Sequence, residues 1–184
     1  MQKVDYRRPA TGWTLNNHTG RWTMGHTALT IFREIAETDF DDVADALIEM
    51  QAHYRVHCPT RDSIIEGLKS RPTGSRILLA YENDKVAGVA CFSAIYPGPG
   101  LTSGFFLKEL YVRHDRRRTG LGKRLMAHLA AMAKQEGHDR IDWTVDADDQ
   151  RLQNFYEMLG GRALPEKRLF RINGAKLTEL AECK

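Results

Sequence analysis

One stretch near the middle of the chain constrains the fold most strongly. Residues 109–126 run as a strand-like segment, a basic turn with two glycines, and the start of a helix with apolar side chains at helical spacing. A helix start offers unpaired N–H groups and a partial positive charge, and glycines let the backbone close around an anion. Arg117, Arg118 and Lys123 add full positive charges at the same place. The stretch therefore predicts a phosphate-binding turn.

Two common phosphate motifs do not fit this turn. A nucleotide P-loop needs a glycine five residues before Gly122 and a hydroxyl after Lys123, but those positions hold Arg117 and Arg124. A dinucleotide fingerprint needs a third glycine where Leu125 stands. The turn therefore belongs to another class of phosphate site, or it is a solvated basic turn.

The periodicity of apolar residues predicts an alternation of strands and helices along the whole chain. Strands are expected at 29–35, 76–81, 86–95, 105–112, 141–145 and 169–172. Helices are expected after a cap at Asp39, at 61–69, from Leu121 to about Glu136, after Asp149 and at 176–183. This order of segments predicts an α+β fold class, with three antiparallel strands in the middle of the chain.

Composition limits the classes of function. With 184 residues, 42% hydrophobic and 28% charged, the chain suits one globular domain with a real core. Residues 29–184 are expected to form that single domain, and residues 1–28 a flexible N-terminal extension. The net charge is only +3 and the basic residues are spread among acids, whereas nucleic-acid binders usually show a broader basic face. We expect no nucleic-acid partner, although the run Arg113–Arg118 keeps that weaker alternative open.

The cysteines and the hydropathy pattern indicate the cellular compartment of the protein. Cys58, Cys91 and Cys183 form an odd and scattered set, which does not look like a disulfide framework. No secretory signal or membrane span is visible. We expect a cytoplasmic protein without a membrane partner. His53 and His57 lie at helical spacing, but further ligands are not obvious, so no metal is expected.

Two motifs together resemble a known superfamily. The pattern Arg-x-x-Gly-x-Gly at residues 117–122 follows a strand and opens a long helix, and it resembles the acetyl-CoA pyrophosphate loop of the GNAT superfamily of N-acetyltransferases. Asn154, Phe155 and Tyr156, followed by Gly160, resemble the segment in which a tyrosine approaches the CoA sulfur. The resemblance covers Thr30 to about Ala181. It implies an α+β (α/β three-layer) GNAT fold, with a mixed, mostly antiparallel central sheet of six to seven strands flanked by about four helices.

Within the superfamily the chain looks closest to the diamine branch, the spermidine/spermine and thialysine N-acetyltransferases. The segments that carry this likeness are 46–54, Tyr96-Pro97, 107–112 and 168–172. That branch shows paired acids where this chain has Lys108 and Glu109. A cation in an amine pocket would repel a polycation, which speaks against a polyamine acceptor.

The resemblance also implies residue roles. Glu109 would be the base that deprotonates the acceptor amine, or else a member of a structural ion pair, and a bulged strand would decide whether Lys108 or Glu109 faces the cleft. Tyr156 would protonate the leaving thiolate, or else pack in the core. Acceptor contacts are expected from Tyr54, Tyr96 and Glu109, with His53 and Glu49 as further candidates. The residues expected to bind acetyl-CoA are Leu110, Tyr111, Val112, Arg117, Arg118, Thr119, Gly120, Leu121, Gly122, Lys123, Asp149, Asn154 and Tyr156.

The expected function follows from these roles. The chain would be an enzyme that moves an acetyl group from acetyl-CoA, its cosubstrate, to a primary amine of a small molecule such as a diamine, polyamine or amino-acid-like compound. The amine would attack directly in a ternary complex. Acetylation of a protein or peptide amine, or non-catalytic sensing of acyl-CoA, remain alternatives. A homodimer is expected at the level of the fold.

Overall fold

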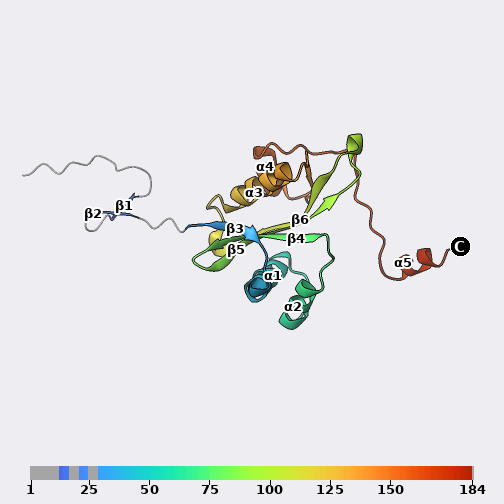
Figure 1. Ribbon diagram of the computed structural model, residues 1–184, viewed down its shortest axis with the longest axis horizontal. Helices are drawn as coiled ribbons and strands as arrows, with labels where there is room; N and C mark the ends of the chain where they lie inside the picture. Colours follow the sequence, from blue (N-terminus) through green and yellow to red (C-terminus); the bar gives the residue numbers. More distant parts are fainter. Residues whose placement is uncertain (1–12, 17–20, 25–28, 184) are drawn as a thin grey trace, which may run out of the picture. The chain divides into compact units, whose positions relative to one another are not determined.

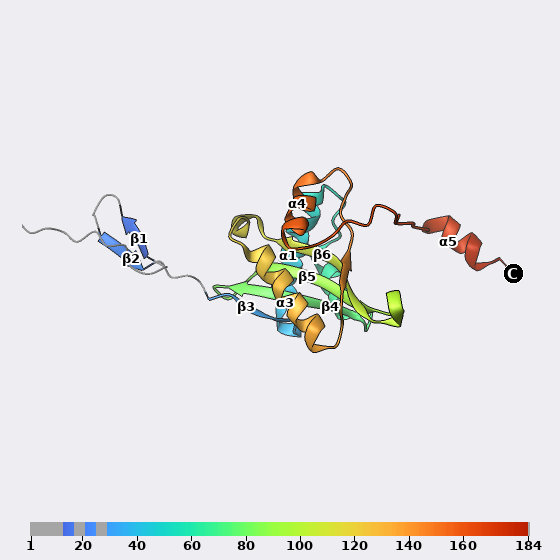
Figure 2. The same ribbon diagram turned by 90° about the horizontal axis from the view of Figure 1, so that it is seen from above.

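The computed structural model describes residues 13–16, 21–24 and 29–183 of the chain. The chain divides into two compact units, Met1–Thr144 and Val145–Lys184, which are described separately (Figures 1 and 2). Most of the predicted N-terminal extension, residues 1–28, lies outside the described residues. Its described parts, β1 (Trp13–Asn16) and β2 (Arg21–Met24), pair antiparallel in a sheet of their own.

A five-stranded mixed sheet organises the first unit, in the order β3-β4-β5-β6-β7. Its first four strands are antiparallel neighbours, and the last is parallel to β6. The turn at Asn83 and Asp84, with φ of 53° and 57°, joins β4 to β5 as the predicted hairpin. The bounds are β3 (Ile31–Glu34), β4 (Ser75–Glu82), β5 (Lys85–Ile95), β6 (Gly104–Val112) and β7 (Ile141–Trp143).

Helices cover both faces of this sheet. Figures 1 and 2 show α1 (Phe40–Tyr54) and α2 (Arg61–Lys69) on one face and α3 (Leu121–Gln135) on the other. The apolar stripe of α1 packs against the sheet, because Val43 and Ala46 lie in one core cluster with Val89. On the other face, a Cβ at Gly88 would lie only 2.9 Å from Cδ1 of Leu125. A glycine at this position lets α3 approach the sheet closely.

The second unit contains α4 (Gln150–Met158) and α5 (Gly174–Ala181). Asp149 caps α4, since its carboxylate accepts a hydrogen bond of 2.8 Å from the N–H of Leu152. Between the two helices, residues 161–173 contain no strand.

The predicted number of elements needs correction. Among the described residues, the central sheet has five strands, not six to seven, and there are five α-helices, not about four. The strand expected at 169–172 is missing, and Phe170 is 87% exposed. Alternating apolar residues form a strand only where a neighbouring strand accepts their hydrogen bonds, and none of the described strands does so here.

Asp39 also differs from its predicted role. It precedes α1, but its side chain caps no N–H of that helix. Its carboxylate instead binds the guanidinium of Arg33 at 2.6 and 2.8 Å and the N–H of Ala36 at 2.7 Å. Asp39 therefore ties β3 to the start of α1. The hydrogen bond from Arg33 lowers the pKa of Asp39 far below its ordinary value, in spite of burial.

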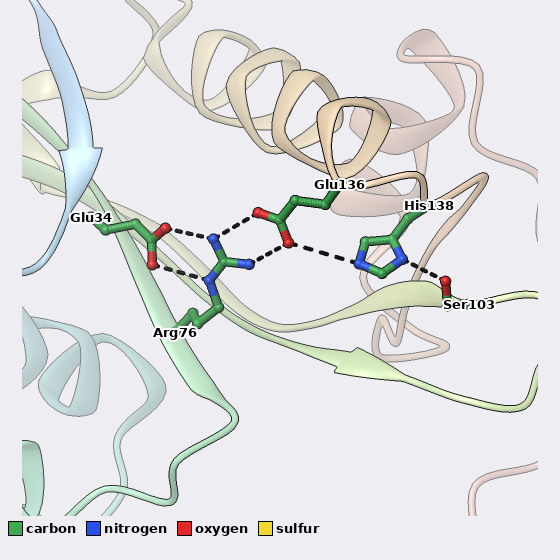
Figure 3. A network of polar contacts seen from close by, with 5 residues as sticks. All are labelled: Glu34, Arg76, Ser103, Glu136 and His138. Carbon is green, nitrogen blue, oxygen red and sulfur yellow. Dashed lines mark hydrogen bonds and ion pairs between the residues drawn. The ribbon is translucent and has the colours of Figure 1, made fainter.

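A polar network joins the end of α3 to the sheet on the face away from α1. Figure 3 shows Arg76 between Glu34 and Glu136, with Glu136 also beside His138, whose ring contacts Ser103. The carboxylate of Glu136 accepts at 2.7 and 2.8 Å from Arg76. These bonds are the main cause of the lowered pKa of Glu136.

We expect Arg76→Met to lower the free energy of unfolding at pH 7 by about 1–2 kcal/mol, because it removes partly exposed ion pairs. A carboxyl whose folded pKa is lowered stabilises the fold above its unfolded pKa, near ~4.3, and loses this effect as pH falls further. The difference between Arg76→Met and the unmodified chain should therefore shrink below about pH 4. Urea unfolding at pH 7 and pH 3.5 measures it. A difference that stays constant across this range would show that the ion pairs contribute nothing.

Candidate active site

Strand β6 leaves half of one edge open. The strand β7 pairs only with Phe105–Leu107, so the rest of β6 has β5 on one side and no described strand on the other. The N–H of Arg113 bonds to the C=O of Ala87 on the β5 side, at 3.0 Å. Because these directions alternate along a strand, Leu110 and Val112 direct their N–H and C=O groups toward the open edge, where the C=O of Val112 already accepts a hydrogen bond of 3.0 Å from Nε of Arg117. An extended ligand can pair with β6 there.

A β-bulge in β6 decides which side chains face α1. Cys91 pairs with Glu109 and Phe92 with Leu107, so Lys108 has no partner residue on β5. Before the bulge, Leu107 shares the α3 face of the sheet with Phe92. After it, Glu109 lies on the α1 face with Cys91, which packs against the core cluster beneath that helix. The bulge therefore directs the side chain of Glu109 to the α1 side of the sheet.

The surroundings of Glu109 agree with either of its two expected roles. Nζ of Lys108 lies 2.9 Å from Oε1 of Glu109, with the Lys108 side chain 65% exposed and that of Glu109 28% exposed. An ion pair this exposed contributes little to stability. Burial, followed by the charge of Glu109, raises the pKa of the neighbouring Cys91 thiol to about 12. The thiol therefore stays protonated at neutral pH.

At the end of β6 the chain forms an uncapped helix start. Gly120 precedes α3 with φ of 82°, a left-handed conformation that suits glycine, and no side chain caps the helix. The first helical hydrogen bond runs from the N–H of Arg124 to the C=O of Gly120, at 3.1 Å. The N–H groups of residues 120–123 therefore have no acceptor within the helix. Their alignment with the helix dipole favours an anion.

The basic residues around this turn fall into two groups. Arg113 is paired with Glu49 at 2.9 Å, and Arg116 lies 3.5 Å from Glu82. In the part of the chain that the structure describes, no carboxylate pairs with the other group, which consists of Arg117, Arg118 and Lys123. This second group contains the three cations predicted from the sequence. Of the remaining residues expected in the loop, Thr119 and Gly122 lie in the same turn, where the Thr119 hydroxyl donates to the C=O of Arg116 at 2.7 Å.

The sequence suggests Glu49 only as a possible acceptor contact, whereas in the structure it binds residues at the end of β6. Its carboxylate accepts hydrogen bonds from the hydroxyl of Tyr111 (2.9 Å), Nε of Arg113 (2.9 Å) and the N–H of His114 (2.7 Å). Burial opposes its ionisation, but these donors outweigh burial, and the pKa of Glu49 is lowered. The sequence places Glu49 beside the apolar stripe of α1, but nothing local identifies its partners on β6.

The expected acceptor residues lie in different places. Tyr54 is half-exposed at the end of α1, next to His53, whose ring lies 6.2 Å from that of Tyr111. Tyr96 is 70% exposed and follows β5. Gly104 pairs with the last residue of β5, so Glu109 is five residues, or about 16 Å, further along β6. The structure thus brings Tyr54 to the Tyr111 side of the sheet and places Tyr96 at the opposite end of the hairpin.

Three further expected residues belong to the second unit. Asp149 uses its carboxylate to cap α4, and Asn154 accepts a hydrogen bond of 2.8 Å from Gln150. Tyr156 is buried, with its ring edge-on to that of Phe155 at 5.1 Å.

Among the described residues, no group of three or more His, Cys, Asp or Glu side chains is placed to hold a metal ion. Within the same part of the chain, the helices are too short or too polar to cross a membrane.

Comparisons with known proteins agree with this geometry. Residues 32–160, well over half of the chain, match the family described as the acetyltransferase (GNAT) family. An integron cassette protein from the mobile metagenome of V. cholerae has a similar structure, with a TM-score of 0.78 and 27% identity over 84% of this chain and 98% of that chain.

Two plant proteins are similar in sequence. An L-ornithine N5-acetyltransferase of Arabidopsis thaliana is 30% identical over 156 residues, which are 82% of this chain and 64% of the plant protein. A tyramine N-feruloyltransferase of Nicotiana tabacum is 25% identical over 129 residues, or 70% of this chain and 55% of that protein. The chain therefore spans less than two thirds of the length of these relatives.

Proposed function

The chain belongs to the acetyltransferase (GNAT) family, and we propose that it transfers an acetyl group from acetyl-CoA to the primary amine of a small molecule. The observation that carries the proposal is the open edge of β6 that runs into the uncapped start of α3. Three cations without a carboxylate partner among the described residues surround that helix start. A thioester with a long extended arm and a diphosphate matches both features.

Each part of acetyl-CoA has residues that fit it. The N–H groups of residues 120–123 and the charges of Arg117, Arg118 and Lys123 suit the diphosphate. Along the open edge, Leu110 and Val112 suit the amide-containing arm as an added strand. An outward N–H of β6 would then donate to the thioester oxygen as negative charge develops on it. When bound, acetyl-CoA supplies the acyl group and a thiolate leaving group.

Two side chains are proposed to accept and donate the protons of the reaction. An alkylammonium has a reference pKa near ~10.4, so a base must take a proton before the amine can attack the carbonyl carbon. Glu109 takes this proton, directly or through a water. As the C–S bond breaks, the phenol of Tyr156 donates a proton to the thiolate and afterwards regains one from solvent. Asp149 and Asn154, on the same helical segment as Tyr156, would complete the cofactor side.

The acceptor is proposed to be a small amine rather than a polyamine. Relatives named for ornithine and tyramine support a small primary amine. Lys108, next to Glu109, would repel an acceptor with several positive charges. Tyr54 lies next to His53, whose ring faces that of Tyr111, while a role for Tyr96 requires an acceptor that reaches the far end of the hairpin.

The proposal also includes a cytoplasmic homodimer. The three cysteines are free, which suits a reducing compartment. Leu169, Phe170 and Ile172 expose apolar side chains from the second unit, and such side chains often pack against a second subunit. Light scattering at micromolar concentration measures the mass directly, and a monomer would contradict this part.

The enzyme is tested by thiol release from acetyl-CoA with a panel of amines. The panel contains L-ornithine, L-lysine, tyramine, spermidine, an aminoglycoside and a peptide with a free N-terminus. We expect release that depends on a small amine. Release with the peptide alone would favour a protein acetyltransferase, and acetyl-CoA binding without any release would favour an acyl-CoA sensor.

We expect Glu109→Gln to lower kcat at pH 7 by about 100-fold, because the amide cannot accept the ammonium proton. The loss should shrink as pH rises toward the pKa of the acceptor amine, where solvent supplies the free base. Glu66→Gln, an exposed acid on α2, is the matched control and should keep its activity. A pH-independent loss in Glu109→Gln would indicate a structural ion pair instead.

A further inference from the structure

The side chain of Tyr111 contacts both α1 and the basic turn. It is 3% exposed, and its hydroxyl donates to Oε1 of Glu49 at 2.9 Å. The guanidinium carbon of Arg117 lies 5.3 Å from the centre of the same ring. Glu49, Tyr111 and Arg117 therefore form a chain of contacts from the helix α1 to the start of α3.

The same chain of contacts restricts how Arg117 can point. Nε of Arg117 donates to the C=O of Val112 at 3.0 Å, so one edge of the guanidinium is used. The two terminal nitrogens remain, and no carboxylate among the described residues pairs with them. A planar guanidinium held by one edge and one face presents its remaining donors in a fixed fork, which suits two phosphate oxygens.

The ionisation states keep this arrangement in place at neutral pH. Hydrogen bonds from His114, Tyr111 and Arg113 keep the carboxyl of Glu49 ionised, because they lower its pKa in spite of burial. Burial, followed by the hydrogen bond to Glu49, raises the pKa of Tyr111 to about 12, so the phenol keeps its proton. The ring under Arg117 is therefore held in one orientation by a donor and an acceptor that do not titrate between pH 6 and pH 9.

We propose that Glu49 and Tyr111 are positioning residues that aim the guanidinium of Arg117 at the diphosphate of acetyl-CoA. This inference rests on the proposed function. It gives the side chain of Tyr111 a role of its own, in addition to the backbone role expected for residues 110–112. It also links α1, on the acceptor side, to the turn that binds the donor.

A double-mutant cycle on CoA binding, measured by isothermal titration calorimetry with the full chain, tests the inference. Arg117→Met should weaken binding about tenfold, because it removes charged hydrogen bonds. Tyr111→Leu should weaken it about fivefold through the lost ring contact and orientation. In the Arg117→Met background, Tyr111→Leu should add less than a twofold loss, since Arg117 is no longer there to be aimed.

Phe92→Leu is the matched control. Phe92 is 2% exposed in the same sheet and lies under another arginine, Arg76, at 5.0 Å. Phe92→Leu also removes a buried ring that lies against an arginine, but on the α3 face of the sheet. CoA affinity should therefore change less than twofold. If Tyr111→Leu does not fold, Tyr111→Phe and Glu49→Gln replace it in the double-mutant cycle. Each should weaken CoA binding about threefold in the otherwise unmodified chain and should cause no further loss in the Arg117→Met background.

Two results would overturn the inference. The first is a loss from Tyr111→Leu, or from its substitutes, that is equal in both backgrounds. The second is unchanged CoA affinity in these variants. If the unmodified chain binds CoA, either result contradicts only the positioning role of Glu49 and Tyr111, and the proposed function is unaffected. If the unmodified chain does not bind CoA, both the positioning role and the proposed function are contradicted.

Discussion

Tyr156→Phe is expected to lower kcat for acetyl transfer by about 100- to 1,000-fold, with little change in the KM for acetyl-CoA. The variant keeps the aromatic ring and removes only the hydroxyl that we propose as the proton donor to the thiolate. A phenol, with a reference pKa near ~10, can protonate a leaving group whose conjugate acid has a pKa near ~8.5 only when it is close to the sulfur. Steady-state thiol release with saturating amine measures the effect.

The control for this prediction is Tyr81→Phe, which removes a hydroxyl from a partly buried tyrosine on β4 that has no proposed role in the reaction. Thermal unfolding of both variants separates catalysis from packing, because Tyr156 is buried beside Phe155. A small loss of kcat in Tyr156→Phe, together with a lowered melting temperature, would mean that Tyr156 serves the core and not the reaction.

Replacing Arg117, Arg118 and Lys123 together by glutamine is expected to weaken acetyl-CoA binding by about 1,000-fold. Each charged hydrogen bond contributes about 1.5–3 kcal/mol, and roughly a factor of ten from each cation gives this total. The N–H groups at the start of α3 remain, so some affinity should persist. The affinity of the variant should also depend less on salt concentration than that of the unmodified chain.

A second triple variant controls for net charge. Arg61 and Lys69 on α2 and Lys134 in the last turn of α3 are exposed cations away from the start of α3, and their replacement by glutamine removes the same total charge. This variant should lose less than threefold in affinity. Equal losses in both triple variants would show that acetyl-CoA responds to the overall charge of the protein and not to a site at α3.

Local patterns predicted much of the fold. The helix expected at 61–69 is α2 with the same bounds, and the turn at Asn83 and Asp84 is the predicted hairpin. The basic turn before α3 also forms where it was predicted, because a glycine in a left-handed conformation and an uncapped helix start are properties of adjacent residues. The family match supports the resemblance to the GNAT superfamily, and the diamine branch remains a prediction.

Other features depend on contacts that are distant in sequence. The strand-like segment 169–172 predicts a strand, but it says nothing of whether a partner strand is present. The bulge at Lys108 shifts the register by one residue, and a single-residue shift decides which side chain faces α1. The bonds of Glu49 to Tyr111, Arg113 and His114 span more than sixty residues. No local signal in the sequence identifies such pairs.

The central claim is that the start of α3 and the open edge of β6 bind acetyl-CoA. The most direct test is a titration of the ¹⁵N-labelled chain with acetyl-CoA, followed through the amide chemical shifts. We predict that the largest shifts belong to residues 118–123, with further shifts at Leu110 and Val112. Shifts confined to the hollow lined by Phe40, Lys69 and Arg71, with residues 118–123 unchanged, would contradict the account.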